Sequence, residues 1–159
     1  MLVALAVIHL SSADICAEPQ SGPGSEPEYC LVSEPTVITT PHFSIDIPAG
    51  YYVGLNVSGR QMYVFDDLEQ RNAGATILVL PAIELQFFDK SILEECGEIA
   101  VPEIGEVECD HSSENSIAKV RFIKTKHRLV WIQYGVRKQF KGMWNAIENL
   151  ESSIVVATD

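Results

Sequence analysis

The sequence of 159 residues predicts an α+β fold, in which an antiparallel β-sheet is covered by a C-terminal amphipathic helix and a short second helix. Two β-rich runs, 117–123 and 129–136, are separated by the five basic-rich residues 124–128, which predicts a β-hairpin. Apolar residues near the C-terminus recur at helical spacing. The length suits one domain.

The remaining strands are expected in chain order before this hairpin. Apolar and polar residues alternate over 43–47, and the pattern stops at a Pro-Ala-Gly turn. Strands are expected again over 51–57 and 62–65. The run 75–80 is apolar on both faces, which is typical of a central strand. Residues 102–116, which enclose Cys109, are expected to form an irregular loop.

Two helices are expected. The apolar stripe of the C-terminal helix consists of Phe140, Met143, Trp144, Ile147, Leu150 and Ile154, with Trp144 near its centre. The short second helix is expected over 91–100, with Asp89 as its N-cap.

The N-terminal part of the chain differs in composition from the rest. Residues 1–10 are almost purely apolar and Ser11-Ser12-Ala13 follows, which predicts a secretory signal peptide over 1–13. No basic residue precedes the apolar run, so a first core strand is the alternative. Residues 14–41 are rich in Pro, Gly and Ser and predict a tail. The single α+β domain is then expected over 42–159.

The four cysteines, Cys16, Cys30, Cys96 and Cys109, form an even set without a Cys-x-x-Cys pair. They predict disulfides and an oxidising compartment, either the periplasm or the outside of the cell. Three pairings are open. Pairing of neighbours, Cys16 with Cys30 and Cys96 with Cys109, closes short loops that each stabilise by roughly 3 kcal/mol in the chain-entropy description.

Composition and missing motifs exclude several classes of function. A net charge of −11 disfavours nucleic acid and anionic lipid as partners. No apolar run reaches the roughly 18 residues that would span a bilayer. The common nucleotide, hydrolase and metalloprotease motifs are missing. We therefore expect no catalytic residue, no cofactor and no metal, and we take the acidic surroundings of His111 as a solvated loop.

Charge is segregated along the chain. Residues 89–114 contain nine acidic residues and one base, whereas 119–141 contain eight bases and no acid. One interpretation is that the two segments pack together and neutralise each other. The other is a dipolar surface that steers a charged protein partner. In that case the candidate partner-binding residues are Lys119, Arg121, Lys124, Lys126 and Arg128.

Two segments resemble the PsbP-like domains. Residues 43–51 (FSIDIPAGY) are similar to the opening strand and turn of that family, and 144–154 (WNAIENLESSI) are similar to its terminal helix. The resemblance covers about residues 43–155 and implies an antiparallel sheet flanked by helices in an exported or lumenal accessory protein without catalysis. Some periplasmic immunity proteins against type VI secretion toxins look similar. The four cysteines and the Pro/Gly-rich tail depart from the family pattern.

The function expected from these observations is that of an exported, non-enzymatic protein-binding domain, such as an accessory, inhibitor or immunity-type factor with an acidic partner. One alternative is a small-molecule or lipid carrier with an apolar pocket between sheet and helix. The other is a hydrolase that uses dispersed carboxylates, for which the candidates are Glu94, Glu98, Glu103 and Asp110.

Overall fold

The computed structural model describes residues 27–56, 58–81, 96 and 104–157. The strands are β1 (Tyr29–Leu31), β2 (Thr36–Thr39), β3 (Phe43–Ile47), β4 (Tyr52–Leu55), β5 (Gln61–Phe65), β6 (Ala73–Pro81), β7 (Gly105–Asp110), β8 (Ser116–Lys124), β9 (Arg128–Arg137) and β10 (Val155–Val156). The 3-10 helix η2 (Lys138–Met143) and the α-helix α2 (Trp144–Ser152) lie between β9 and β10. The predicted signal segment 1–13 and most of the predicted helix 91–100 lie outside the described residues.

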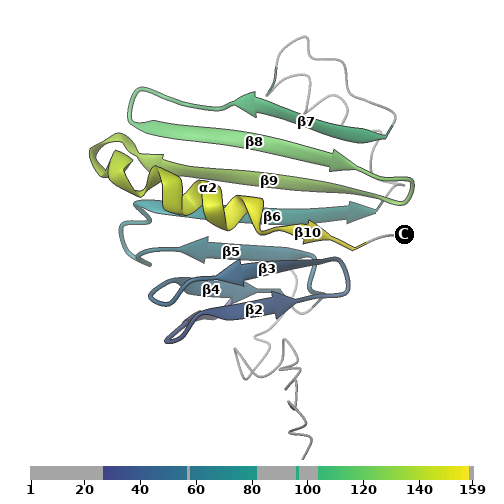
Figure 1. The fold of residues 1–159 in the computed structure, drawn as a ribbon, viewed down its shortest axis with the longest axis horizontal. Coiled ribbons are helices and arrows are strands. Elements are labelled where there is room, and N and C mark those ends of the chain that lie inside the picture. The colour runs from purple at the N-terminus through teal and green to yellow at the C-terminus, as the bar shows by residue number, and fades with distance from the viewer. Residues whose placement is uncertain (1–26, 57, 82–95, 97–103, 158–159) are drawn as a thin grey trace, which may run out of the picture.

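The strands form two antiparallel sheets (Figure 1). The larger has seven strands in the order β1-β4-β5-β6-β9-β8-β7, and the smaller has three in the order β10-β3-β2. The expected central strand is β6, which pairs with β5 and β9. The expected basic-tipped hairpin is formed by β8 and β9. The α+β prediction is confirmed.

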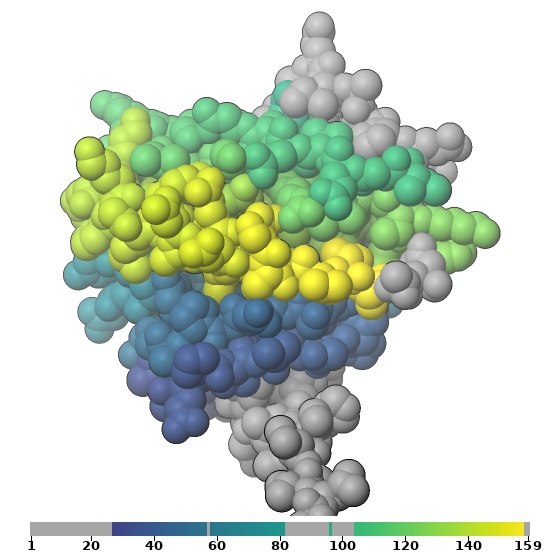
Figure 2. All heavy atoms as spheres, in the orientation of Figure 1, coloured from purple at the N-terminus to yellow at the C-terminus, as the bar shows by residue number. Residues whose placement is uncertain are grey.

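One face of the large sheet carries the main core. Alternate residues of the central strands point to this face, such as Ile77 of β6 opposite Ile132 of β9, and both are fully buried. Helix α2 packs across β6 and β9, and the small sheet contributes Ile45 to the same cluster. In Figure 2 the C-terminal segment, in yellow, lies between β7–β8 and β2–β3 and completes the layer that covers this face.

The amphipathic stripe enters this core, but its centre is not where the sequence indicated. Ile147 and Leu150 are almost completely buried. Trp144 is the first residue of α2 and is only half-buried, with its ring stacked on that of Tyr134 at a centroid distance of 5.9 Å. Phe140 has non-helical backbone angles, so the regular helix begins after it. Within the described ranges, no helix is long and apolar enough to cross a membrane.

Two predicted boundaries are wrong. The predicted tail 14–41 contains strands β1 and β2, and the predicted loop 102–116 contains β7. The mean composition of the tail is rich in Pro and Ser, so it does not reveal a short β-forming run such as Thr36–Thr39. The Ile38 side chain of this run is buried in the core. The domain therefore begins no later than Tyr29. The acidic residues of β7 are paired with bases on β8, as described below.

Candidate functional site

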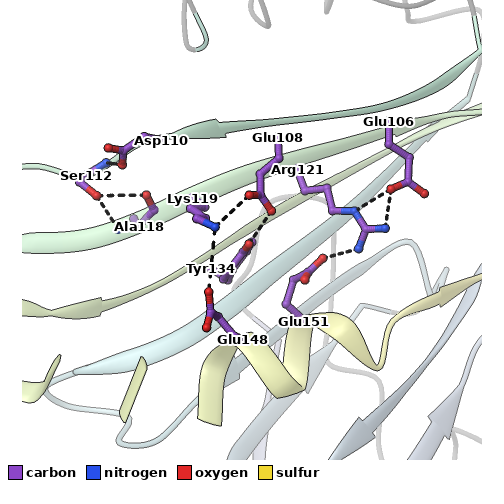
Figure 3. A network of polar contacts seen from close by, with 10 residues as sticks. All are labelled: Glu106, Glu108, Asp110, Ser112, Ala118, Lys119, Arg121, Tyr134, Glu148 and Glu151. Atoms are coloured by element: carbon purple, nitrogen blue, oxygen red, sulfur yellow. Dashed lines mark hydrogen bonds and ion pairs between the residues drawn. The ribbon is translucent and has the colours of Figure 1, made fainter. Parts of the chain in front are cut away.

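A polar network crosses the edge of the helix-covered face, where β7, β8 and α2 meet (Figure 3). The register places β7 beside β8, with Glu108 opposite Arg121 and Asp110 opposite Lys119. Because side chains alternate along a strand, these four point to the same face as the helix. The network consists of Glu106, Glu108, Lys119, Arg121, Tyr134, Glu148 and Glu151.

Glu108 is held by two donors. Lys119 Nζ lies 2.9 Å from Glu108 Oε1, and the Tyr134 hydroxyl donates to Oε2 at 2.7 Å. Burial alone would raise the pKa of Glu108, but the hydrogen bonds from Lys119 and Tyr134 outweigh it and keep the pKa below its usual value. Burial, followed by the bond to Glu108, raises the pKa of Tyr134. Glu108 therefore stays ionised and Tyr134 stays neutral.

Arg121 joins the sheet to the helix. Its guanidinium donates through Nε and Nη2 to Glu106 Oε2, at 3.2 Å and 2.6 Å, and through Nη1 to Glu151 Oε1. The Glu151 side chain is only 7% exposed, whereas that of Glu106 is 55% exposed. Arg121 is thus the counter-ion of a buried carboxylate on α2, which indicates a structural role.

These contacts support the interpretation in which the segregated charges neutralise each other. Lys119 and Arg121 pair with acids of β7 and α2, so their charge is used within the fold. The other three candidate partner-binding residues lie elsewhere, at the tip of the β8–β9 hairpin. Lys124 and Arg128 are half-buried there, and Lys126 is exposed. The structure does not bring the five bases together into one surface.

On the opposite face of the large sheet, the side chains near the tip of the β8–β9 hairpin are buried. A second buried cluster lies there, and Val120 and Leu129 are completely buried in it. Cys96 packs against this cluster and is disulfide-bonded to Cys109 of β7. This is one of the two local pairings expected from the sequence. Cys30 is also in a disulfide, and Cys16 lies outside the described residues.

The other half of this face contains a hollow of about 270 Å³, hereafter the open-face hollow. Its floor is a row of small residues across three strands: Gly74 of β6 faces Gly135 of β9, which faces Ala118 of β8. A Cβ at position 74 would lie 2.3 Å from the Val64 carbonyl oxygen. One at 135 would lie 2.7 Å from the Ile117 carbonyl oxygen. The fold therefore keeps this floor free of larger side chains.

The next row of the sheet supplies one wall of the hollow. Thr76 and Gln133 are directly opposite each other and line it, and both are half-buried. The Phe65 ring stands beside the floor, close to Gly74. The Arg71 guanidinium lies over that ring, 4.8 Å from its centroid. The walls therefore combine an aromatic ring with hydrogen-bonding groups and positive charge.

Two unusual features meet at one end of the hollow. Arg71 is the one non-glycine residue of the described chain with a positive φ, of 47°, a conformation that L-residues seldom adopt. Its neighbour Asn72 is 7% exposed, lines the hollow, and has a buried Oδ1 that accepts no hydrogen bond from the described residues. Arg137, which is exposed, lies beside them, with its backbone N–H bonded to the Asn72 carbonyl.

The β5–β6 loop holds these residues in place. Asp67 Oδ1 accepts the backbone N–H groups of Glu69 and Gln70, and Asp66 Oδ1 accepts that of Ala73. A buried acceptor left without a donor lowers the free energy of unfolding by roughly 1–3 kcal/mol, so the unpaired Asn72 Oδ1 is unusual. Backbone strain at Arg71 and an unpaired buried acceptor at the neighbouring Asn72 are together typical of a functional site.

Sequence reasoning missed this site. The available signal was Gly135 inside the run 129–136 and Gly74 directly before the run 75–80, because glycines in strands often mark a close approach of backbone or ligand. That signal does not reveal that the two glycines are neighbours. Their pairing depends on the register of β6 and β9, which are 61 positions apart at this point (135 − 74).

The described residues give little support to acid–base or metal chemistry. Of the predicted hydrolase carboxylates, Asp110 is described, and hydrogen bonds from the Ser112 side chain and backbone lower its pKa. Glu94, Glu98 and Glu103 lie outside the described residues. Over the described ranges, no group of three or more His, Cys, Asp or Glu residues is placed to hold a metal ion.

No protein-family model matches the chain, and no curated protein matches it. The function therefore has to be argued from the geometry of the two faces.

Proposed function

We propose that the protein is an exported, non-enzymatic domain that binds another protein through the open-face hollow. The observation that carries the proposal is the hollow itself, with a floor that only glycine can form at positions 74 and 135 and an unpaired acceptor at Asn72. Export is supported by the Cys96–Cys109 disulfide, since such bonds persist in oxidising compartments.

The lining of the hollow favours binding over catalysis. Among the described residues that line it there is no carboxylate, histidine or cysteine, which are the usual general bases and nucleophiles. Ser116 lines it, but the hydrogen-bond partner of its hydroxyl among the described residues is the Ser113 hydroxyl, at 2.7 Å, and not a general base. An accessory, inhibitor or immunity-type role fits this lining.

The size of the hollow favours a protein over a free small molecule or a lipid. At about 270 Å³ it lies at the lower limit of the roughly 300–1,000 Å³ of most small-molecule sites. The polar end around Asn72 is unsuited to an acyl chain. Among the described residues, side chains such as those of Ile147 and Leu150 are packed between sheet and helix, which gives no support to the alternative of a carrier pocket there. A side chain inserted by a protein partner suits the hollow best.

Affinity capture with a matched variant tests this proposal. Thr76→Trp fills the hollow with a residue that strands favour, and Thr76→Val keeps the native shape. The wild type and Thr76→Val are expected to retain a stoichiometric partner from the host's extracytoplasmic extract, whereas Thr76→Trp loses it. Equal capture by all three proteins, or a lipid as the bound species, would contradict the proposal.

A further inference from the structure

We infer that the open-face hollow recognises an acidic residue in an extended segment of the partner protein. This inference rests on the proposed function and adds the chemistry of what is bound. It combines three independent observations: an exposed guanidinium at one end of the hollow, a buried unpaired acceptor beside it, and a floor without side chains.

The floor allows a polypeptide backbone to approach the sheet closely. Glycine is placed where a backbone or ligand comes near, and Gly74 and Gly135 lie side by side on neighbouring strands. The row is closed at its ends by Phe65 and by the β8 strand that carries Ala118. An extended segment fits such a shallow depression better than a helix, whose diameter with side chains is about 10–12 Å.

The polar end of the hollow selects charge. Arg137 is exposed and belongs to the row that also contains Ser116, while the Arg71 guanidinium lies over Phe65. The exposed Arg137 guanidinium beside the depression attracts an anion, in a protein whose net charge is −11. A carboxylate that reaches Arg137 is bound by charge-assisted hydrogen bonds, which are roughly twice as strong as neutral ones.

Asn72 completes the recognition. Asn72 lines the hollow, and its buried Oδ1 accepts no hydrogen bond from the described residues, so a bound segment toward which this side chain turns would supply the missing donor. A free carboxylate anion has no such donor, whereas every non-proline residue of a peptide has a backbone N–H. An Asp or Glu residue within a polypeptide provides the carboxylate for Arg137 and the N–H for Asn72 together. This pairing distinguishes a protein segment from inorganic phosphate or a simple organic anion.

The experiment uses a phage-displayed library of random heptapeptides selected on the full chain, with counter-selection against Thr76→Trp. The strongest binder is then made synthetically, and its affinity is measured by fluorescence anisotropy. We expect selected peptides to share an Asp or Glu at a fixed position. Arg137→Gln should weaken binding about tenfold or more and Asn72→Leu about fivefold, as expected for lost charge-assisted and neutral hydrogen bonds.

Arg60→Gln is the matched control, because Arg60 is exposed, directly precedes β5 and does not line the hollow, so this variant should bind like the wild type. Raising the salt concentration should weaken binding to the wild type more than to Arg137→Gln. Melting curves check that each variant is folded. If Thr76→Trp does not fold, Gln133→Trp replaces it as the variant that fills the hollow.

The outcomes distinguish failure of the inference, that an acidic residue is recognised, from failure of the proposed function, that a protein binds in the hollow. Peptides that need the hollow but lack a shared acid, or that bind Arg137→Gln as well as the wild type, overturn this inference and leave the proposed function standing. A selection from which counter-selection removes every binder, so that no peptide needs the hollow, overturns both.

Discussion

Replacing Arg121 by methionine should destabilise the protein far more than removing its exposed partner. Arg121 binds two carboxylates, of which Glu151 is 7% exposed and Glu106 is 55% exposed. The Arg121→Met variant leaves the Glu151 carboxylate buried without a counter-ion. Breaking a fully buried pair costs about 3–5 kcal/mol, and since the Arg121 side chain is itself 22% exposed we expect about 2–4 kcal/mol.

The assay is urea denaturation at pH 7, supported by thermal melts. For a chain of this size about 1 kcal/mol shifts the Tm by 2–4 °C, so Arg121→Met should lower it by about 4–16 °C. Glu106→Gln should cost about 1 kcal/mol or less, because an exposed ion pair contributes little. The double variant Arg121→Met with Glu151→Leu should recover most of the loss, since no buried charge then remains. Equal losses of unfolding free energy in Arg121→Met and Glu106→Gln would show that Arg121 is not the counter-ion of a buried carboxylate.

Three further predictions concern the core, the polar network and the disulfide. Ile147→Ala should cost about 2–5 kcal/mol in urea denaturation, whereas Asn149→Ala, exposed on the same helix, should stay within about 0.5 kcal/mol; similar losses would mean that the helix does not dock through this face. Because the pKa of Glu108 is lowered in the folded protein, its ionised carboxylate stabilises the fold. This stability is fully present at pH values above 4.5, the ordinary pKa, and is lost as the pH falls through the pKa of the folded state. Acid melts should therefore show a smaller loss below pH 4.5 in Glu108→Gln than in the wild type, and identical profiles would count against the hydrogen bonds described. Non-reducing peptide mapping of protein from its native compartment should yield a Cys96–Cys109 peptide, and free thiols at both positions would contradict export.

Periodicity was enough to predict the elements with strong patterns. The β8–β9 hairpin followed from two β-rich runs with a short tip, and α2 from apolar residues at helical spacing. Burial of Ile147 and Leu150 agrees with that stripe. These elements were accessible because one face of each is buried, so the apolar pattern has to match the period of the secondary structure.

Strand β7 was missed because its stability comes from a neighbour. Three of its six residues are acidic, and acids are poor strand formers in isolation. The ion pairs of Glu106 with Arg121 and Glu108 with Lys119 compensate for that, and the bases belong to β8. The segregated charge in the sequence was therefore a signal of strand pairing between acidic and basic segments.

The open-face hollow could not be predicted because it depends on sheet register. Neither Gly74 nor Gly135 indicates a site alone, and Asn72 is ordinary in a turn. The site appears when pairing of β6 with β9 brings both glycines together and the β5–β6 loop turns Arg71 and Asn72 toward them. Such long-range juxtaposition is set by the whole sheet and not by local sequence.

Mapping the bound partner on the protein by amide NMR tests the central claim most directly. In a titration of the isotope-labelled protein with its captured partner, we expect the largest shift changes at Gly74, Thr76 and Gln133, which line the hollow. Asn145 and Asn149, exposed on α2 on the other face, should not move. Changes confined to α2 or to the hairpin tip around Lys126, with the hollow unaffected, would contradict it.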